Sequence, residues 1–324
     1  MSVDLYAGAP APSALPQTAN RDHTVSALTD AYLAAYAGRD HSRERYLREW
    51  VEIIGARRLS ELDADVVGDA LQVLADKPAM RFVGYGAADG KPIYKTLGKR
   101  SPATCNRIRA ALGSLLTWAM RTRRAPRGFS NPVRDTEAQR ENNARTRFLS
   151  PAERDRLLKV ARVSNWSRLY LFVLLGLTTG ARRSEMLNLR YRDVDREQGV
   201  AYLGRTKNGQ PRTLVLVPAV IAEIDRCGKA PSANAFLFPA KYRSDKPMNP
   251  EAPFQRALRE AQIYDFRIHD LRHSAASYLA QSGATLLEIA EVLGHQTLDV
   301  TRRYSHLTVN NRRELVTRVL GGIG

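Results

Sequence analysis

Hydrophobic residues in the first 125 positions recur at the spacing of amphipathic helices. Four stripes can be read: Leu28, Tyr32 and Tyr36; Tyr46, Trp50 and Ile54; Val66, Val67, Leu71 and Leu74; and Ile108, Leu112, Leu115, Leu116, Ala119 and Met120. Asp63 can cap the third helix, and Ser101-Pro102 is a typical helix start. Four helices with short connections predict a small bundle over residues 22–125. Residues 1–21, rich in Ala and Pro without periodicity, are predicted to be a disordered tail.

Two short runs of strand-forming residues interrupt the helical pattern between the third and fourth stripes. Residues 82–85 and 93–94 flank Asp89-Gly90, a pattern typical of a hairpin. The whole insert, 77–100, is basic and carries Lys91, Lys95, Lys99 and Arg100. Two interpretations stay open, a solvated loop or a wing that touches nucleic acid.

A second set of elements begins near residue 148. Residues 149–153 form a capping box with Pro at the first helical position, and the apolar run 169–177 predicts a buried helix. Residues 200–203 and 213–217 have the composition of strands, and Asn208-Gly209 between them signals a tight hairpin. The pattern predicts a fold that is mainly α with a small antiparallel sheet (α+β), in which residues 148–324 form the second domain.

Net charge narrows the choice of partner. The 324 residues include 50 Lys and Arg against 33 Asp and Glu, a formal net charge of +17. This charge predicts that the binding partner is a polyanion. Nucleic acid is a better candidate than an anionic membrane, because no separate basic amphipathic helix with an aromatic face stands out. The sequence has no run of about 18 apolar residues, so we expect no membrane span.

A basic segment separates the two halves of the chain. Residues 121–147 hold eight Arg against three acidic residues, and Pro126, Gly128 and Pro132 interrupt any helix. We therefore expect residues 126–147 to be a basic linker. Such a connector suits wrapping around a duplex, because distributed cations gain phosphate contacts.

Cysteine usage and the N-terminus bear on the cellular compartment. Only Cys105 and Cys227 are present, too few for a disulfide framework, and this fits a reducing cytoplasm. The first residues lack the basic-then-apolar pattern of a signal peptide. A cytoplasmic location is expected.

Cationic and imidazole side chains, with one phenol, occur in a fixed order in the second half. His269 and Arg272 lie three apart, so on a helix they share one face. The opposite face would be buried through Leu271, Ala275, Tyr278 and Leu279. A guanidinium offers a rigid fork of donors that matches a phosphate. The full ordered set is Arg182, Lys207, His269, Arg272, His295 and Tyr304.

With these residues in place, the chain resembles the tyrosine recombinases of the phage-integrase and Xer type. Residues 179–185 resemble the first box of that family, and residues 269–273 together with 293–304 resemble its second. The resemblance implies a helical N-terminal core-binding domain followed by an integrase-like catalytic domain. The insert at 77–100 departs from the usual family pattern.

The resemblance implies metal-free cleavage of a phosphodiester, with each residue in a defined role. Tyr304 is the nucleophile that forms a 3′-phosphotyrosyl bond, Arg182 and Arg272 clamp the non-bridging oxygens, and His295 adds a donor. Rejoining needs no ATP because the covalent link stores the bond energy. No cofactor is expected, and no Asp/Glu cluster has the spacing of a divalent-metal site.

The remaining residues around this set have supporting assignments. Lys207 is the candidate acid for the departing 5′ oxygen, although Arg205 could serve instead. His269 is assigned to the tyrosine proton, and Glu185 to holding a nearby arginine in one orientation. His273 and His306 are expected to be bystanders.

The same resemblance implies the partners and leaves two alternatives. The partners are double-stranded DNA recombination sites and further copies of the chain, with a tetramer in the synaptic complex and accessory DNA-bending factors as an option. The protein would be bacterial, nucleoid-associated or encoded by a mobile element. The alternatives are a type IB topoisomerase-like DNA relaxase and a catalytically silent DNA-binding regulator on the same scaffold.

A short apolar stripe follows the candidate nucleophile. Residues 311–320 carry Leu315, Val316, Val319 and Leu320 with arginines off the stripe. So short a helix must dock its apolar side somewhere. It can pack on its own domain, or, as the family resemblance implies, on a neighbouring protomer.

Overall fold

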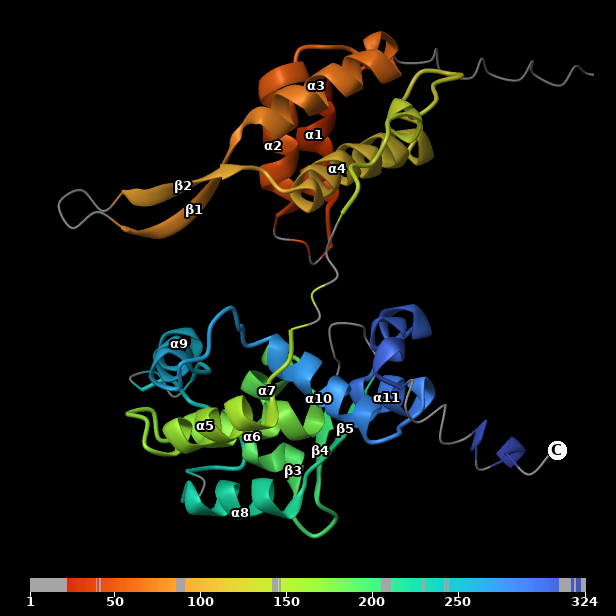
Figure 1. Cartoon of the computed structure of the whole chain (residues 1–324). Coiled ribbons are helices and arrows are strands. Elements are labelled where there is room, and N and C mark those ends of the chain that lie inside the picture. Colours follow the sequence, from red (N-terminus) through yellow and green to blue (C-terminus); the bar gives the residue numbers. More distant parts are fainter. Residues whose placement is uncertain are drawn as a thin grey trace, which may run out of the picture. The chain divides into compact units, whose positions relative to one another are not determined.

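The chain forms two compact units, Met1–Asn143 and Ala144–Gly324, in the computed structural model (Figure 1). The structure describes residues 22–324 except 39, 41, 86–90, 142–144, 146, 205–210, 229–230, 242, 244, 309–315, 318 and 322–324. Within this part of the chain, no helix is long and apolar enough to cross a membrane. The predicted tail over residues 1–21 lies outside it.

The first unit is a helical bundle, as the hydrophobic stripes predicted. Its helices are α1 (Val25–Ala35), α2 (Arg43–Ile54), α3 (Ala64–Asp76) and α4 (Pro102–Arg121), with a 3₁₀ turn η1 (Leu59–Glu61). Asp63 caps α3 and Ser101 caps α4 through their side chains. The fully buried Trp50 donates from its indole Nε1 to the Ile108 carbonyl at 2.9 Å, which fixes α2 against α4.

The insert at 77–100 is a regular antiparallel hairpin. Strand β1 (Pro78–Tyr85) pairs with β2 (Pro92–Lys99), and the ribbon projects beyond the helices of its unit (Figure 1). The hairpin prediction is confirmed for the strands. The predicted turn at Asp89-Gly90 lies outside the described residues.

The segment after α4 differs from the linker expected over 126–147. A 3₁₀ turn η2 (Pro132–Asp135) packs on α4, and Val133 joins the core of the first unit. Arg109 donates to the Val133 carbonyl at 2.6 Å and to Thr136 Oγ1 at 2.8 Å. This packing was not predicted, because Pro132-Val133 is a short apolar pair within a segment dominated by arginines.

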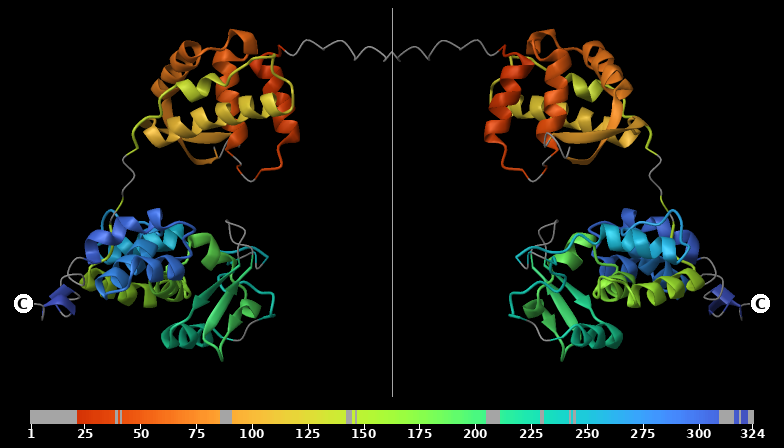
Figure 2. Two further views of the ribbon diagram at one scale, coloured as in Figure 1. Left: turned by 90° about the vertical axis from the view of Figure 1, so that its right-hand side faces the viewer. Right: turned by 90° about the vertical axis from the view of Figure 1, so that its left-hand side faces the viewer.

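The second unit combines helices with a small sheet. Its helices are α5 (Pro151–Arg162), α6 (Leu169–Thr179), α7 (Arg183–Asn188), α8 (Pro218–Arg226), α9 (Glu251–Glu260), α10 (Asp270–Gln281) and α11 (Leu286–Leu293), with 3₁₀ turns η3 (Tyr191–Asp193), η4 (Leu298–Val300) and η5 (Arg302–Thr308). The sheet has the antiparallel order β3 (Val194–Asp195), β4 (Val200–Leu203), β5 (Arg212–Val215), and lies to one side of the unit beside α8 (Figure 2). The predicted fold class, mainly α with a small antiparallel sheet, is confirmed.

Helix α10 is more deeply buried than its sequence pattern indicated. The prediction gave it one apolar face and an outward pair, His269 and Arg272. In the structure Asp270, Arg272 and His273 are all buried, while His269 is the exposed residue just before the helix. The reason is that α10 packs against α6 on one side and against α11 and η5 on another.

The end of the chain is described only in part. Leu315 of the predicted apolar stripe lies outside the described residues. The side chains of Val316, Val319 and Leu320 are exposed. Docking of this segment, in its own unit or on another copy, stays a prediction.

Candidate active site

Five of the six residues singled out from the sequence line one cavity in the second unit. The cavity has a volume of about 320 Å³ and is lined by Arg182, His269, Arg272, His273, His295, Gln296, Thr297, Val300, Arg303 and Tyr304. The sixth, Lys207, lies outside the described residues, as does Arg205. The lining includes three arginines and three histidines and, among the described residues, no carboxylate. Such a cavity suits an anionic ligand.

The turn between α6 and α7 positions Arg182. Gly180 ends α6 in the left-handed region at φ 59°, and a Cβ there would lie 2.3 Å from Leu293 Cδ2. The glycine therefore permits both the turn and its close packing on α11. Arg182 follows at the N-cap of α7, and its Nη2 lies 3.4 Å from the Gly294 carbonyl.

Glu185 holds two arginines, of which Arg182 lines the cavity. Its carboxylate accepts from the Arg182 backbone N–H at 2.8 Å, from Arg182 Nη1 at 2.7 Å and from Arg212 Nη1 at 3.2 Å. Arg212, at the start of β5, also donates to the Val292 carbonyl at 2.6 Å. This supporting role of Glu185 was predicted from the sequence, whereas Arg212, which links the sheet to the end of α11, was not singled out.

Arg272 is a buried cation. It is 5% exposed, and its Nη1 donates to the Gly180 carbonyl at 2.7 Å. Burial and then the nearby Arg182 and Arg212 lower the pKa of its guanidinium to about 10, which leaves it charged at neutral pH. A buried charge next to two like charges is costly without an anion, so this arrangement favours binding of one.

His295 is held by its own loop. Gly294 ends α11 at φ 65°, and His295 Nδ1 lies 2.7 Å from Oγ1 of the fully buried Thr301. Burial and then Arg272 and Arg182 lower the pKa of His295 to about 4. In the neutral imidazole that accepts at Nδ1, Nε2 carries a hydrogen and can donate.

The phenol of Tyr304 meets His273, not His269. Tyr304 Oη lies 2.6 Å from His273 Nδ1, and both side chains are buried. Burial raises the pKa of Tyr304, and burial followed by His269 lowers the pKa of His273 to about 4. His273 is therefore neutral at neutral pH, and its imidazole can accept the phenol proton.

His273 was expected to be a bystander, and the structure places it beside the candidate nucleophile. The rings of His269 and His273 pack edge to face with centroids 5.1 Å apart. A signal existed in the sequence, because residues four apart on a helix share a face. Which of the two approaches Tyr304 depends on where η5 docks.

The buried histidines predict acid sensitivity. The folded-state pKa values of His273 and His295, about 4, lie below the ordinary value of 6.5, so the unfolded chain binds protons that the folded chain does not. Their contribution to stability is complete above pH 6.5 and should be lost as the pH falls towards 4. We expect the melting temperature to fall over this window, and to fall less steeply in His273→Gln. An equally steep fall in the variant would contradict the neutral, buried His273.

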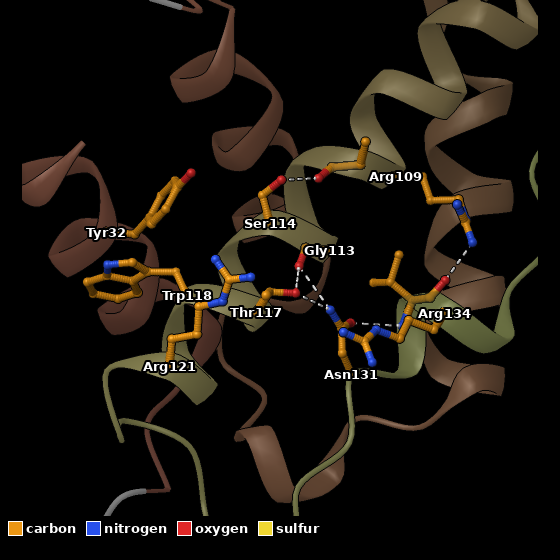
Figure 3. Close-up of a pocket in the computed structure, with 11 residues that line it drawn as sticks. Tyr32, Arg109, Gly113, Ser114, Thr117, Trp118, Arg121, Asn131 and Arg134 are labelled. Carbon is orange, nitrogen blue, oxygen red and sulfur yellow. Dashed lines mark hydrogen bonds between the residues drawn. The ribbon is translucent and has the colours of Figure 1, made fainter. Parts of the chain in front are cut away.

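The first unit has a larger hollow, about 540 Å³, lined mainly by residues of α4 and of the segment that follows it (Figure 3). Asn131 is buried beneath it and donates to the Gly113 carbonyl at 2.9 Å and to Thr117 Oγ1 at 3.1 Å. The exposed Arg121 and Arg134 line the hollow together with Trp118. Cations, small polar groups and an aromatic ring are typical of a nucleic-acid contact surface.

Comparison with solved structures identifies the fold. The chain superposes on the Tn1549 transposon integrase in complex with transposon right end DNA with a TM-score of 0.69 and 18% sequence identity, covering 92% of this chain and 100% of that one. At this identity the likeness shows a shared fold alone.

Comparison with known sequences identifies the family. The chain is 31% identical to the shufflon-specific DNA recombinase of Escherichia coli, over 64% of this chain and 52% of the relative, and 30% identical to the integrase of Salmonella phage P22, over 53% and 46%. It thus spans about half the length of these relatives. The profile of the phage integrase family matches residues 147–311, about half of the chain and the part that carries the cavity. The chain belongs to the phage integrase family of tyrosine recombinases.

Proposed function

We propose that this protein is a site-specific DNA recombinase that cuts and rejoins DNA through a 3′-phosphotyrosyl intermediate. The observation that carries the proposal is the Tyr304 phenol, 2.6 Å from the His273 imidazole, in a cavity that Arg182 and Arg272 also line. These groups supply a nucleophile, a proton acceptor and charge stabilisation for a phosphorane.

The proposed reaction transfers one phosphoryl group. Arg182 and Arg272 bind the non-bridging oxygens of the scissile phosphate, and His295 donates to one of them through Nε2. Tyr304 Oη attacks phosphorus and gives its proton to His273 Nδ1, so that the tyrosyl O–P bond forms as the bond to the 5′ oxygen breaks. Reversal with the 5′ hydroxyl of another strand completes the exchange.

The departing 5′ oxygen needs a proton, and Lys207 is the proposed donor. Its position in the connection between β4 and β5 supports this assignment, because the connection leads directly into Arg212. Arg212 is bonded to Glu185, which also holds Arg182 at the cavity. An ammonium delivered there can act as a general acid.

His273, rather than His269, is the proposed acceptor of the tyrosine proton. The 2.6 Å contact to the phenol supports this assignment. His269 lines the same cavity and is only partly covered, and its pKa is lowered first by this partial burial and then by Arg272. We propose that His269 binds the phosphate or relays the proton outward from His273.

The proposed partners are duplex DNA and further copies of the chain, with four copies in the synaptic complex. Solved relatives support the DNA partner, since the Tn1549 integrase was captured with transposon end DNA. The tetramer and the accessory DNA-bending factors rest on family resemblance. A cytoplasmic location is proposed on the same ground.

The test is capture of a covalent adduct with DNA. Duplexes of about 60 bp that tile the DNA flanking the gene would each carry one nick, so that cleavage releases a short fragment and traps the enzyme. We expect a denaturation-resistant adduct at a 3′ end and exchange between two plasmids that carry the responsive site. An adduct with relaxation of supercoiled DNA but no exchange would indicate a relaxase instead. DNA binding without any adduct would indicate a silent regulator.

A further inference from the structure

The β1–β2 hairpin has no role in the proposed reaction, yet both of its ends are held by ion pairs to the same helix. Lys77 Nζ, just before β1, lies 2.6 Å from a carboxylate oxygen of Glu52. Arg100, just after β2, pairs with Glu49, and both of these side chains are largely buried. Because both acids lie on α2, the two ends of the hairpin are fixed to one helix.

The surface of the hairpin is unusual for a solvated loop. Its strands expose Met80, Val83, Ile93, Tyr94 and Leu97, each about half exposed. Single exposed apolar residues are ordinary, but a group of them on one small element marks an interaction site. A two-stranded hairpin alone is marginally stable in water, so this one depends on its fixed ends and on whatever it contacts.

The charge of the hairpin indicates which class of partner it binds. Residues 77–100 contain six Lys or Arg and a single acidic residue, Asp89, which lies in the connection between the strands. Lys95 and Lys99 on β2 are exposed. Apolar contacts with a protein partner need no excess of positive charge, whereas binding to a phosphate backbone does.

The dimensions of the hairpin fit one kind of site. Paired strands lie about 5 Å apart, and the major groove of DNA, about 12 Å wide, admits a two-stranded ribbon. Lysines along the ribbon reach phosphates, and apolar and aromatic side chains contact base edges and thymine methyl groups. We propose that the β1–β2 hairpin is a DNA-contacting ribbon that enters a groove of the recombination site and contributes to its sequence preference. This proposal rests on the proposed function, because that function supplies duplex DNA as the partner.

Crosslinking tests this contact directly. The full chain, in the Tyr304→Phe background so that cleavage cannot interfere, would carry the photocrosslinker p-benzoylphenylalanine in place of Tyr94 and be bound to a 60-bp duplex from the DNA that flanks the gene. We expect ultraviolet light to produce a protein–DNA crosslink that maps to one or two base steps. The matched control places the crosslinker at Tyr264, an exposed tyrosine of the second unit. A crosslink to a second copy of the chain, or none while the DNA is bound, would overturn the proposal.

Charge removal gives a second, independent readout. Lys95→Gln/Lys99→Gln should lower the slope of log Kd against log salt by about 2, since each lost phosphate contact lowers it by about 1. Lys159→Gln/Lys246→Gln removes the same charge from exposed lysines of the second unit and should leave the slope unchanged. Equal slopes for all three proteins would contradict the ribbon contact. These binding measurements do not depend on cleavage, so failure to form an adduct would count against the proposed function alone.

Discussion

Tyr304→Phe should bind DNA as the wild type does and form no covalent adduct. The substitution removes one oxygen atom, and with it the nucleophile. Because the ring stays, the small core of Ala276, Ala280, Ile289 and Leu293 that surrounds it is retained. The cost in stability should be about 1–3 kcal/mol, since His273 Nδ1 loses its partner. Denaturing gels of nicked duplexes and a thermal melt measure the two effects.

A matched control is available on α10. Tyr278 is half-buried, and its hydroxyl donates to the Leu149 carbonyl at 3.0 Å. Tyr278→Phe therefore makes the same chemical deletion with a similar cost in stability, away from the cavity residues. Adduct formation should survive in this control. If Tyr304→Phe still formed an adduct, Tyr304 would not be the nucleophile.

Much of the architecture could be predicted because it depends on local signals. The capping box at Ser150 and the one at Thr285 set helix starts, and Gly180 and Gly294 set helix ends in the left-handed region. These signals act within one turn of the chain, so they are legible in the sequence alone. The order Arg182 to Tyr304 was likewise legible, and the structure brings five of those six residues to one cavity.

What could not be predicted depends on docking between distant segments. Tyr304 lies 31 residues from His273, and only the packing of η5 against α10 decides that His273 meets the phenol. Arg145 gives a second case. It was counted as a linker cation, yet it is bonded to the buried Asp270 at 2.8 Å and to Asp265 at 3.0 Å within the second unit. Charge counts do not reveal which cations already have a partner.

Glu185→Gln should have the second large effect, on stability and on catalysis together. The carboxylate is 7% exposed and is shared by Arg182 and Arg212. Removing its charge leaves two guanidiniums next to Arg272 without their counterion. Breaking a buried ion pair from one side costs about 3–5 kcal/mol. Because Arg182 also loses its fixed orientation, we expect adduct formation to slow by about 10²–10³-fold, the loss typical of one misplaced oxyanion donor.

The control must separate a loose fold from a misplaced arginine, and Glu223 on α8 allows this. It is also a buried carboxylate, 4% exposed, and it accepts from Arg226 Nε at 3.0 Å, but Arg226, unlike Arg182, does not line the cavity. Glu223→Gln should lower the melting temperature to a comparable extent while the rate of adduct formation per folded molecule stays near that of the wild type. Rates would be measured at a temperature where each protein is fully folded by circular dichroism. If the two variants lose the same activity per folded molecule, Glu185 acts through global stability, and its assigned role of holding Arg182 at the phosphate is wrong.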